Sequence, residues 1–216
     1  MNLQSLRRKA LDNSLEVEHI LRAAIEGVPG LSAELANLTH RCGWSFTTHL
    51  PDGTHVVPFA RWAAVASAYA NHGFAGLNSI AADEDSAPYV IGLLEEIKTP
   101  DAVDALLTIF ANSLEEPSIY QATTHRLVQA INLLFSVKNS SISAPEQRRV
   151  CAKFLNKTLL VAGSNAQRAM VMYAMRGAGD RSCLEALSTV QDTEPPYAGA
   201  KAAAIKAIQK RLCNEA

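Results

Sequence analysis

The sequence lacks several features that would assign it to a familiar class of protein. Aromatic residues make up only 6% of its 216 residues, whereas alanine is abundant. No stretch approaches the length of a membrane span, and no continuous apolar segment follows the basic residues near the N-terminus as in a secretory signal. We therefore expect a cytoplasmic protein without a membrane partner. With 48% hydrophobic and 19% charged residues, the chain should fold into closely packed helices.

Paired cysteine motifs are also missing. The four cysteines are widely spaced and no CxxC occurs, which argues against a zinc finger or a dithiol redox site. The expectation is buried free thiols in a reducing compartment, at Cys42, Cys151, Cys183 and Cys213.

Catalytic signatures are absent as well. The sequence has no GxSxG, Walker-type or GxGxxG pattern, and no histidine is followed by glutamate. Adjacent glutamates, such as Glu95 and Glu96, point about 100° apart on a helix, so they do not converge on a substrate. We accordingly assign no catalytic, cofactor-binding or metal-binding residue, and we do not expect an enzyme.

One segment, residues 44–58, has the alternating pattern of strands and contains the turn sequence Pro51-Asp52-Gly53. It predicts a β-hairpin. If Leu50 pairs with Thr54, then His49 faces His55. Such a pair could bind a metal, respond to pH or contact a partner, but no third ligand lies nearby in sequence, so a solvated pair is the simpler interpretation.

Apolar residues at helical spacing, separated by turn signals, cover most of the remaining chain. A break near residues 12–14 divides the first of the predicted helices, which span residues 3–28, 31–41, 59–73, 74–81, 86–97, 101–113, 117–136, 145–162, 165–177, 181–190 and 196–213.

The second half of the chain repeats itself. The segment EPSIYQATTHRLVQAI begins at Glu116, and the similar EPPYAGAKAAAIKAI begins at Glu194, 78 positions later. DALLTI (104–109) likewise matches EALSTV (185–190). The repeated unit is a helix pair of about 40 residues. Such a pair leaves one apolar surface exposed unless a similar neighbour covers it, which is the pattern of a solenoid.

The stretches TPDAVDALLTIF, GAGDRSCLEALSTV and AGAKAAAIKAIQKRL resemble HEAT-type helical repeats over residues 86–213. This resemblance implies an all-α, right-handed solenoid of antiparallel helix pairs with the hairpin added. We expect a single domain, 1–216, with N-terminal helices and hairpin in 1–85 and repeats in 86–213. In such arrays the second helices line the concave side, where a polar row would contain Gln121, His125, Asn132, Gln167 and Arg168.

Charge is unevenly distributed. Residues 1–140 carry nine basic and fifteen acidic residues, whereas residues 141–216 carry eleven and six. An acidic region steers basic partners toward it. We therefore expect a non-enzymatic protein-binding module, most specifically a bacterial immunity protein that neutralises a cognate toxin by direct binding, with a basic toxin domain as the partner that suits an acidic region. The predicted partner-binding residues are the polar row above with His49, His55, Asp83, Glu84, Asp85, Glu95, Glu96, Glu115 and Glu116.

Two alternatives remain open. A scaffold or adaptor would use both charged ends of the chain to join two proteins. A HEAT-like nucleic-acid binder would use the basic residues of the last third, but no aromatic residues are interleaved with them to stack on bases. These basic residues are Arg148, Arg149, Lys153, Lys157, Lys201, Lys206, Lys210 and Arg211.

Overall fold

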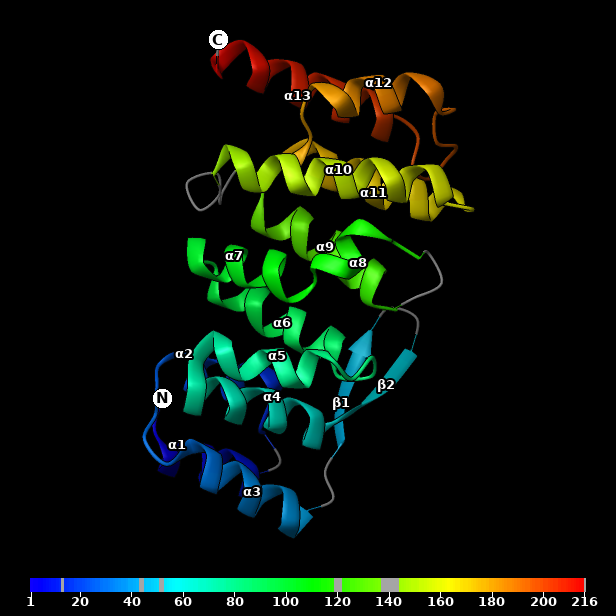
Figure 1. Cartoon of the computed structure of the whole chain (residues 1–216). Helices are drawn as coiled ribbons and strands as arrows, with labels where there is room; N and C mark the ends of the chain where they lie inside the picture. The colour runs from blue at the N-terminus through cyan, green and yellow to red at the C-terminus, as the bar shows by residue number, and fades with distance from the viewer. Residues whose placement is uncertain (13, 43–44, 51–52, 119–121, 137–143, 216) are drawn as a thin grey trace. The chain divides into compact units, whose positions relative to one another are not determined.

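A computed structural model of the chain shows a predominantly helical protein (Figure 1), which confirms the helical fold class. It describes residues 1–12, 14–42, 45–50, 53–118, 122–136 and 144–215, with the backbone alone at 40–42, 45–50, 53–58 and 215. No helix in these described ranges is both long enough and apolar enough to cross a membrane.

The chain divides into two compact units, Met1–Ile97 and Lys98–Ala216. The first unit ends with α6 (Ala87–Ile97), a helix that the sequence assigns to the repeats but that packs on α2 (Val17–Ile25), α4 (Phe59–His72) and α5 (Leu77–Ala81). The boundary between the units therefore follows α6 instead of preceding it. The prediction of a single domain stays a prediction.

The N-terminal unit has its core where α1 (Leu3–Leu11), α2, α3 (Leu31–Cys42) and α4 meet. Leu6, Ile20, Leu35 and Phe59 are almost completely buried there. The break predicted near residues 12–14 separates α1 from α2, and His19 Nδ1 accepts a hydrogen bond from the Glu16 amide at the start of α2. Between α4 and α5 lies a short 3₁₀ helix, η1 (Gly73–Gly76).

Two strands, β1 (Ser45–Leu50) and β2 (Gly53–Pro58), pair antiparallel in this unit. Their register pairs Leu50 with Gly53, His49 with Thr54 and Thr48 with His55. The predicted pairing of Leu50 with Thr54 is therefore wrong by one residue, and His49 does not face His55. A register shift of a single residue gives every residue of one strand a different partner on the other strand. Residues 51 and 52 lie outside the described residues.

The C-terminal unit contains three successive helix groups. They are α7 (Pro100–Ile109) with α8 (Ala111–Glu115) and α9 (Ala122–Leu134), then α10 (Pro145–Val161) with α11 (Asn165–Ala178), then α12 (Arg181–Thr189) with α13 (Ala200–Glu215). The first helices contact one another through α10, which packs on α7, α8 and α12. The second helices contact one another through α11, which packs on α9 and α13. Helices thus form two layers within this unit (Figure 1).

The repeated sequence has the same structural role in both copies. Leu127, Ile131 and Leu134 of α9 are fully buried, and so are their counterparts Ala204 and Ile208 of α13. The helix starts also follow the expected signals. Thr99 caps α7, which begins with Pro100, and Asp180 caps α12 by accepting a hydrogen bond from the Ser182 amide.

Helix boundaries differ from the prediction in several places, among them the last helix, which begins at Ala200 and not at residue 196. The helix predicted over 101–113 is divided at Phe110, whose backbone leaves the helical conformation while its ring is buried. A helix is predicted over 117–136, and the helix observed there, α9, begins at Ala122. Residues 119–121 lie outside the described part of the chain. Packing of Phe110 thus overrides a continuous helical pattern.

The cysteines divide into two kinds. Cys151 and Cys183 are buried free thiols, as predicted, and burial raises the pKa of both, that of Cys183 to about 11. Cys213, in contrast, is exposed near the end of α13, so the prediction of a buried thiol is wrong there. The side chain of Cys42 lies outside the described part of the chain.

Candidate functional site

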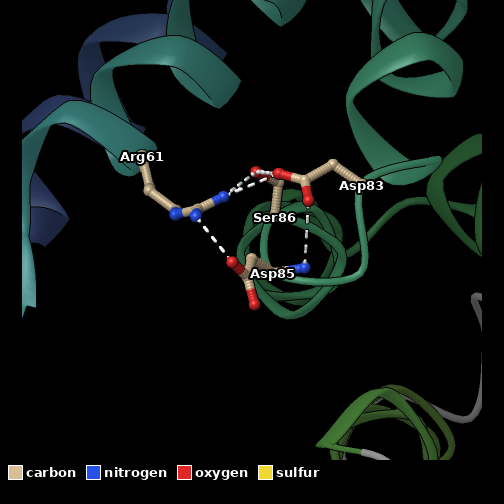
Figure 2. A network of polar contacts seen from close by, with 4 residues as sticks. All are labelled: Arg61, Asp83, Asp85 and Ser86. Atoms are coloured by element: carbon tan, nitrogen blue, oxygen red, sulfur yellow. Dashed lines mark hydrogen bonds and ion pairs between the residues drawn. The ribbon is translucent and has the colours of Figure 1, made fainter.

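The predicted acidic turn before α6 is bound by an arginine of the same unit. Arg61, on α4, donates one hydrogen bond to Asp83 at 2.6 Å, one to Asp85 at 2.9 Å and one to the Ser86 hydroxyl at 2.7 Å. The Ser86 hydroxyl in turn donates to Asp83 at 2.6 Å. Figure 2 shows that the guanidinium and the serine hydroxyl point to the same carboxylate of Asp83.

This network affects whether the acidic turn can bind a basic partner. The hydrogen bond from Ser86 and then those from Arg61 lower the pKa of Asp83, because they stabilise its charged form. Asp83 and Asp85 are exposed, but a basic partner would have to compete with Arg61 for the same oxygens. Glu84, between them, is exposed. Asp83 and Asp85 therefore link the turn before α6 to α4 through Arg61.

The other predicted acidic residues are in different surroundings. Glu95 is buried within α6, so it cannot meet a partner at the surface. Glu96 is exposed on the same helix. Glu115 and Glu116 are exposed at the end of α8 in the C-terminal unit, where Lys157 donates a hydrogen bond to the Glu115 carbonyl oxygen. The acidic residues are thus distributed over both units.

A hollow of about 240 Å³ lies on the N-terminal unit between α2 and α6. Three glutamates line it, together with one arginine and two aliphatic side chains, of which Ile25 is 37% exposed. Glu18 forms an i,i+4 ion pair with Arg22 at 3.0 Å, and Glu26 binds the N-terminal amine. The lining residues are Glu18, Leu21, Arg22, Ile25, Glu26 and Glu96. This hollow combines acidic groups with apolar area and is named the α2/α6 groove below.

The predicted polar row of the second helices is only partly a surface row. Asn132 is exposed on α9, whereas His125 and Arg168 are half-buried. Within the described residues, His125 Nε2 and Arg168 Nε are buried and have no hydrogen-bond partner. Gln167 caps α11 by accepting hydrogen bonds from the Gly163 and Ser164 amides, so its side chain already has a structural role.

The C-terminal unit carries a second hollow, of about 230 Å³, where the starts of α10 and α12 approach the end of α13. Four of its nine lining residues are arginines, and the one acidic residue is Asp180. The residues are Pro145, Arg148, Arg149, Gly179, Asp180, Arg181, Ser182, Arg211 and Leu212. The name arginine pocket is used for it below.

Sequence reasoning missed part of both sites. Glu18 and Glu26 lie on a helix far in sequence from Glu96, and Arg181 stands apart from the basic residues noted in the last third. A signal was present for α2, because Glu18, Arg22 and Glu26 are spaced at four residues and therefore share one side of a helix. Nothing in the sequence indicated that α6 packs on α2.

No described group of three or more histidine, cysteine, aspartate or glutamate side chains is placed to hold a metal ion. The side chains of His49 and His55, and all of Gln121, lie outside the described residues, so their predicted partner-binding role stays a prediction. Comparison with known protein families, with curated proteins and with solved structures yields no match.

Proposed function

We propose that the protein is a non-enzymatic protein-binding module whose C-terminal unit is a short HEAT-like α-solenoid. The solenoid interpretation is supported by the two layers of that unit, in which α10 packs between neighbouring first helices and α11 between neighbouring second helices. Solenoids expose a large surface relative to their core, and binding of macromolecules is a frequent use of that surface. Fold alone does not assign a function, so the proposal depends on the sites.

The α2/α6 groove is the observation that carries the proposal. It has three glutamates around a hollow with exposed aliphatic area at Ile25, and a basic partner would compete with Arg22 for Glu18 and with the N-terminal amine for Glu26. A lysine or arginine side chain would place its charged end among the glutamates and its methylene stem against Leu21 and Ile25. The N-terminal unit, with six basic and eleven acidic residues, would attract such a partner from a distance.

The narrower form of the proposal is a bacterial immunity protein that occupies a basic toxin domain. It is supported by the negative charge of the N-terminal unit. The alternative is an adaptor, and it is supported by the opposite charge of the C-terminal unit, which has fourteen basic and ten acidic residues. The neighbouring gene distinguishes these two: a large chain with a variable C-terminal domain favours the immunity protein.

The test is capture of partners from a native lysate on immobilised wild-type protein and on a Glu18→Gln/Glu96→Gln variant, with quantification by mass spectrometry. A partner of the groove should be depleted on the variant and should be released from the wild type by salt, because exposed charge pairs are screened. The recovered protein, once purified, should bind at least tenfold more weakly to the variant.

A matched control removes the same amount of charge elsewhere. Glu185→Gln/Glu194→Gln alters two acidic residues of the C-terminal unit and should leave binding unchanged. Equal binding to all three proteins would overturn the role of the groove. Turnover of a small molecule by the purified chain would overturn the non-enzymatic proposal itself.

A further inference from the structure

The arginine pocket lies in the C-terminal unit and has no part in the function proposed above. We propose that it binds a compact dianion, specifically the phosphate group of a small phosphomonoester.

The arginines reach the pocket from three separate elements. Arg148 and Arg149 belong to the first turns of α10, Arg181 begins α12, and Arg211 lies near the end of α13. Arg211 is fixed in place because it donates hydrogen bonds to the carbonyl oxygens of Arg176 at 2.9 Å and Gly179 at 2.6 Å. Tertiary packing therefore assembles the pocket from three helices that are separate in the sequence.

Positive charge exceeds negative charge around this hollow. Arg149 forms an exposed ion pair with Glu146 at 2.8 Å, which water screens strongly. The one lining carboxylate, Asp180, accepts hydrogen bonds from the Ser182 amide at 2.9 Å and the Ser182 hydroxyl at 2.6 Å. Of the nine lining residues, four are arginine and one is aspartate, so cationic side chains outnumber carboxylates in the lining. The Ser182 amide already donates its hydrogen bond to Asp180. The proposed anion site therefore depends on the arginine side chains and not on the backbone amides at the start of α12.

Arg181 is the residue best placed to receive a ligand. It is exposed and, within the described part of the chain, has no hydrogen-bond or ion-pair partner. Its guanidinium is a planar fork that matches two oxygens of a phosphate group. A phosphate group bound in the pocket would offset the mutual repulsion of the arginine side chains that line it.

The size and lining of the pocket favour a small phosphomonoester over a nucleic acid. A volume of about 230 Å³ is below the range of roughly 300–1,000 Å³ that is common for drug-sized ligands. None of the nine lining residues is aromatic, so the pocket offers no surface on which a base could stack. A phosphate group with a short substituent fits both observations.

The test is isothermal titration calorimetry with glycerol phosphate at constant ionic strength. Wild-type protein should bind it, and an Arg149→Gln/Arg181→Gln variant should bind about tenfold more weakly or worse, because charge-assisted hydrogen bonds are lost. The matched control, Lys153→Gln/Lys206→Gln, removes two exposed cations that do not line the pocket and should bind like wild type. Circular dichroism would show that all three proteins are folded.

A second measurement uses the charge of the ligand. The second pKa of a phosphomonoester is about 6, so binding of glycerol phosphate should weaken between pH 8 and pH 5. Sulfate keeps both of its charges over this range, and it would lie among the same side chains, the four arginines, Asp180 and Glu146. Sulfate binding should therefore change little, which separates the ligand's titration from a change in the protein.

Three outcomes would overturn the proposal. The first is that folded wild-type protein does not bind glycerol phosphate at millimolar concentration. The second is that the control variant loses as much affinity as the pocket variant, which would indicate non-specific attraction. The third is that a thymidine oligonucleotide binds more tightly than glycerol phosphate and loses its binding in the pocket variant, which would assign the pocket to nucleic acid.

Discussion

Arg7 and Glu34 form a two-pronged ion pair that joins α1 to α3 in the N-terminal unit. Arg7 Nε donates to one oxygen of Glu34 at 2.8 Å, and Arg7 Nη2 donates to the other at 2.6 Å. Glu34 is 5% exposed, whereas the arginine remains 58% exposed. The pair raises the pKa of Arg7, chiefly through the hydrogen bonds to Glu34. A carboxylate this deeply buried depends on such a partner.

Replacement of Arg7 by glutamine should lower the unfolding temperature, because the buried Glu34 loses the two charge-assisted hydrogen bonds from Arg7. Thermal unfolding followed by circular dichroism measures the change. Arg8→Gln is the control, since Arg8 is 86% exposed and its ion pair with Asp12 has a separation of 3.7 Å. The expectation fails if the two variants melt at the same temperature.

Asp83→Asn should destabilise the protein at neutral pH and should have less effect in acid. The folded-state pKa of Asp83 is lowered below its ordinary value of 3.8 by Ser86 and Arg61. The charged carboxylate therefore contributes stability above that value, and the contribution disappears as the pH falls through the folded-state pKa. Urea unfolding at pH 7 and near pH 3 measures the difference between variant and wild type. A constant difference at both pH values, or an equal effect of Glu84→Gln, would contradict this role.

Gly177→Ala should destabilise the protein by about 1–3 kcal/mol, the usual cost of overpacking. A Cβ at position 177 would collide with the backbone carbonyl of Phe135, where α11 approaches the chain just after α9. Gly163→Ala is the matched control, because its nearest neighbour is the Gln167 side chain at 3.8 Å. Chemical unfolding measures the free energy of unfolding of both variants. If the two values are similar, the close approach of Gly177 to the Phe135 carbonyl is not required for stability.

Cys213 should react with a thiol reagent much faster than Cys151 and Cys183 in the folded protein. It is exposed, whereas the other two are buried and have a raised pKa, so that little thiolate is present near neutral pH. Timed alkylation followed by peptide mass spectrometry reports each cysteine separately. In denaturant the three cysteines should be labelled at similar rates. Equal labelling rates in the folded protein would contradict the burial of Cys151 and Cys183.

The helical fold and the repeated burial pattern could be predicted because they depend on local order in the sequence. Leu127, Ile131 and Leu134 recur at helical spacing, and the caps at Thr99 and Asp180 are short-range signals. The strand register was predicted wrongly by one residue, since the same alternating sequence allows neighbouring registers and the connection length selects between them.

The sequence alone determined which segments are helices and that the negative and positive charges separate along the chain. The tertiary structure decided what those charges do. It placed Arg61 against Asp83 and Asp85, buried Glu95, and brought Arg149, Arg181 and Arg211 around one pocket. The reason is that periodicity describes which side of a helix is apolar, whereas the partner of a polar group depends on packing between elements distant in sequence.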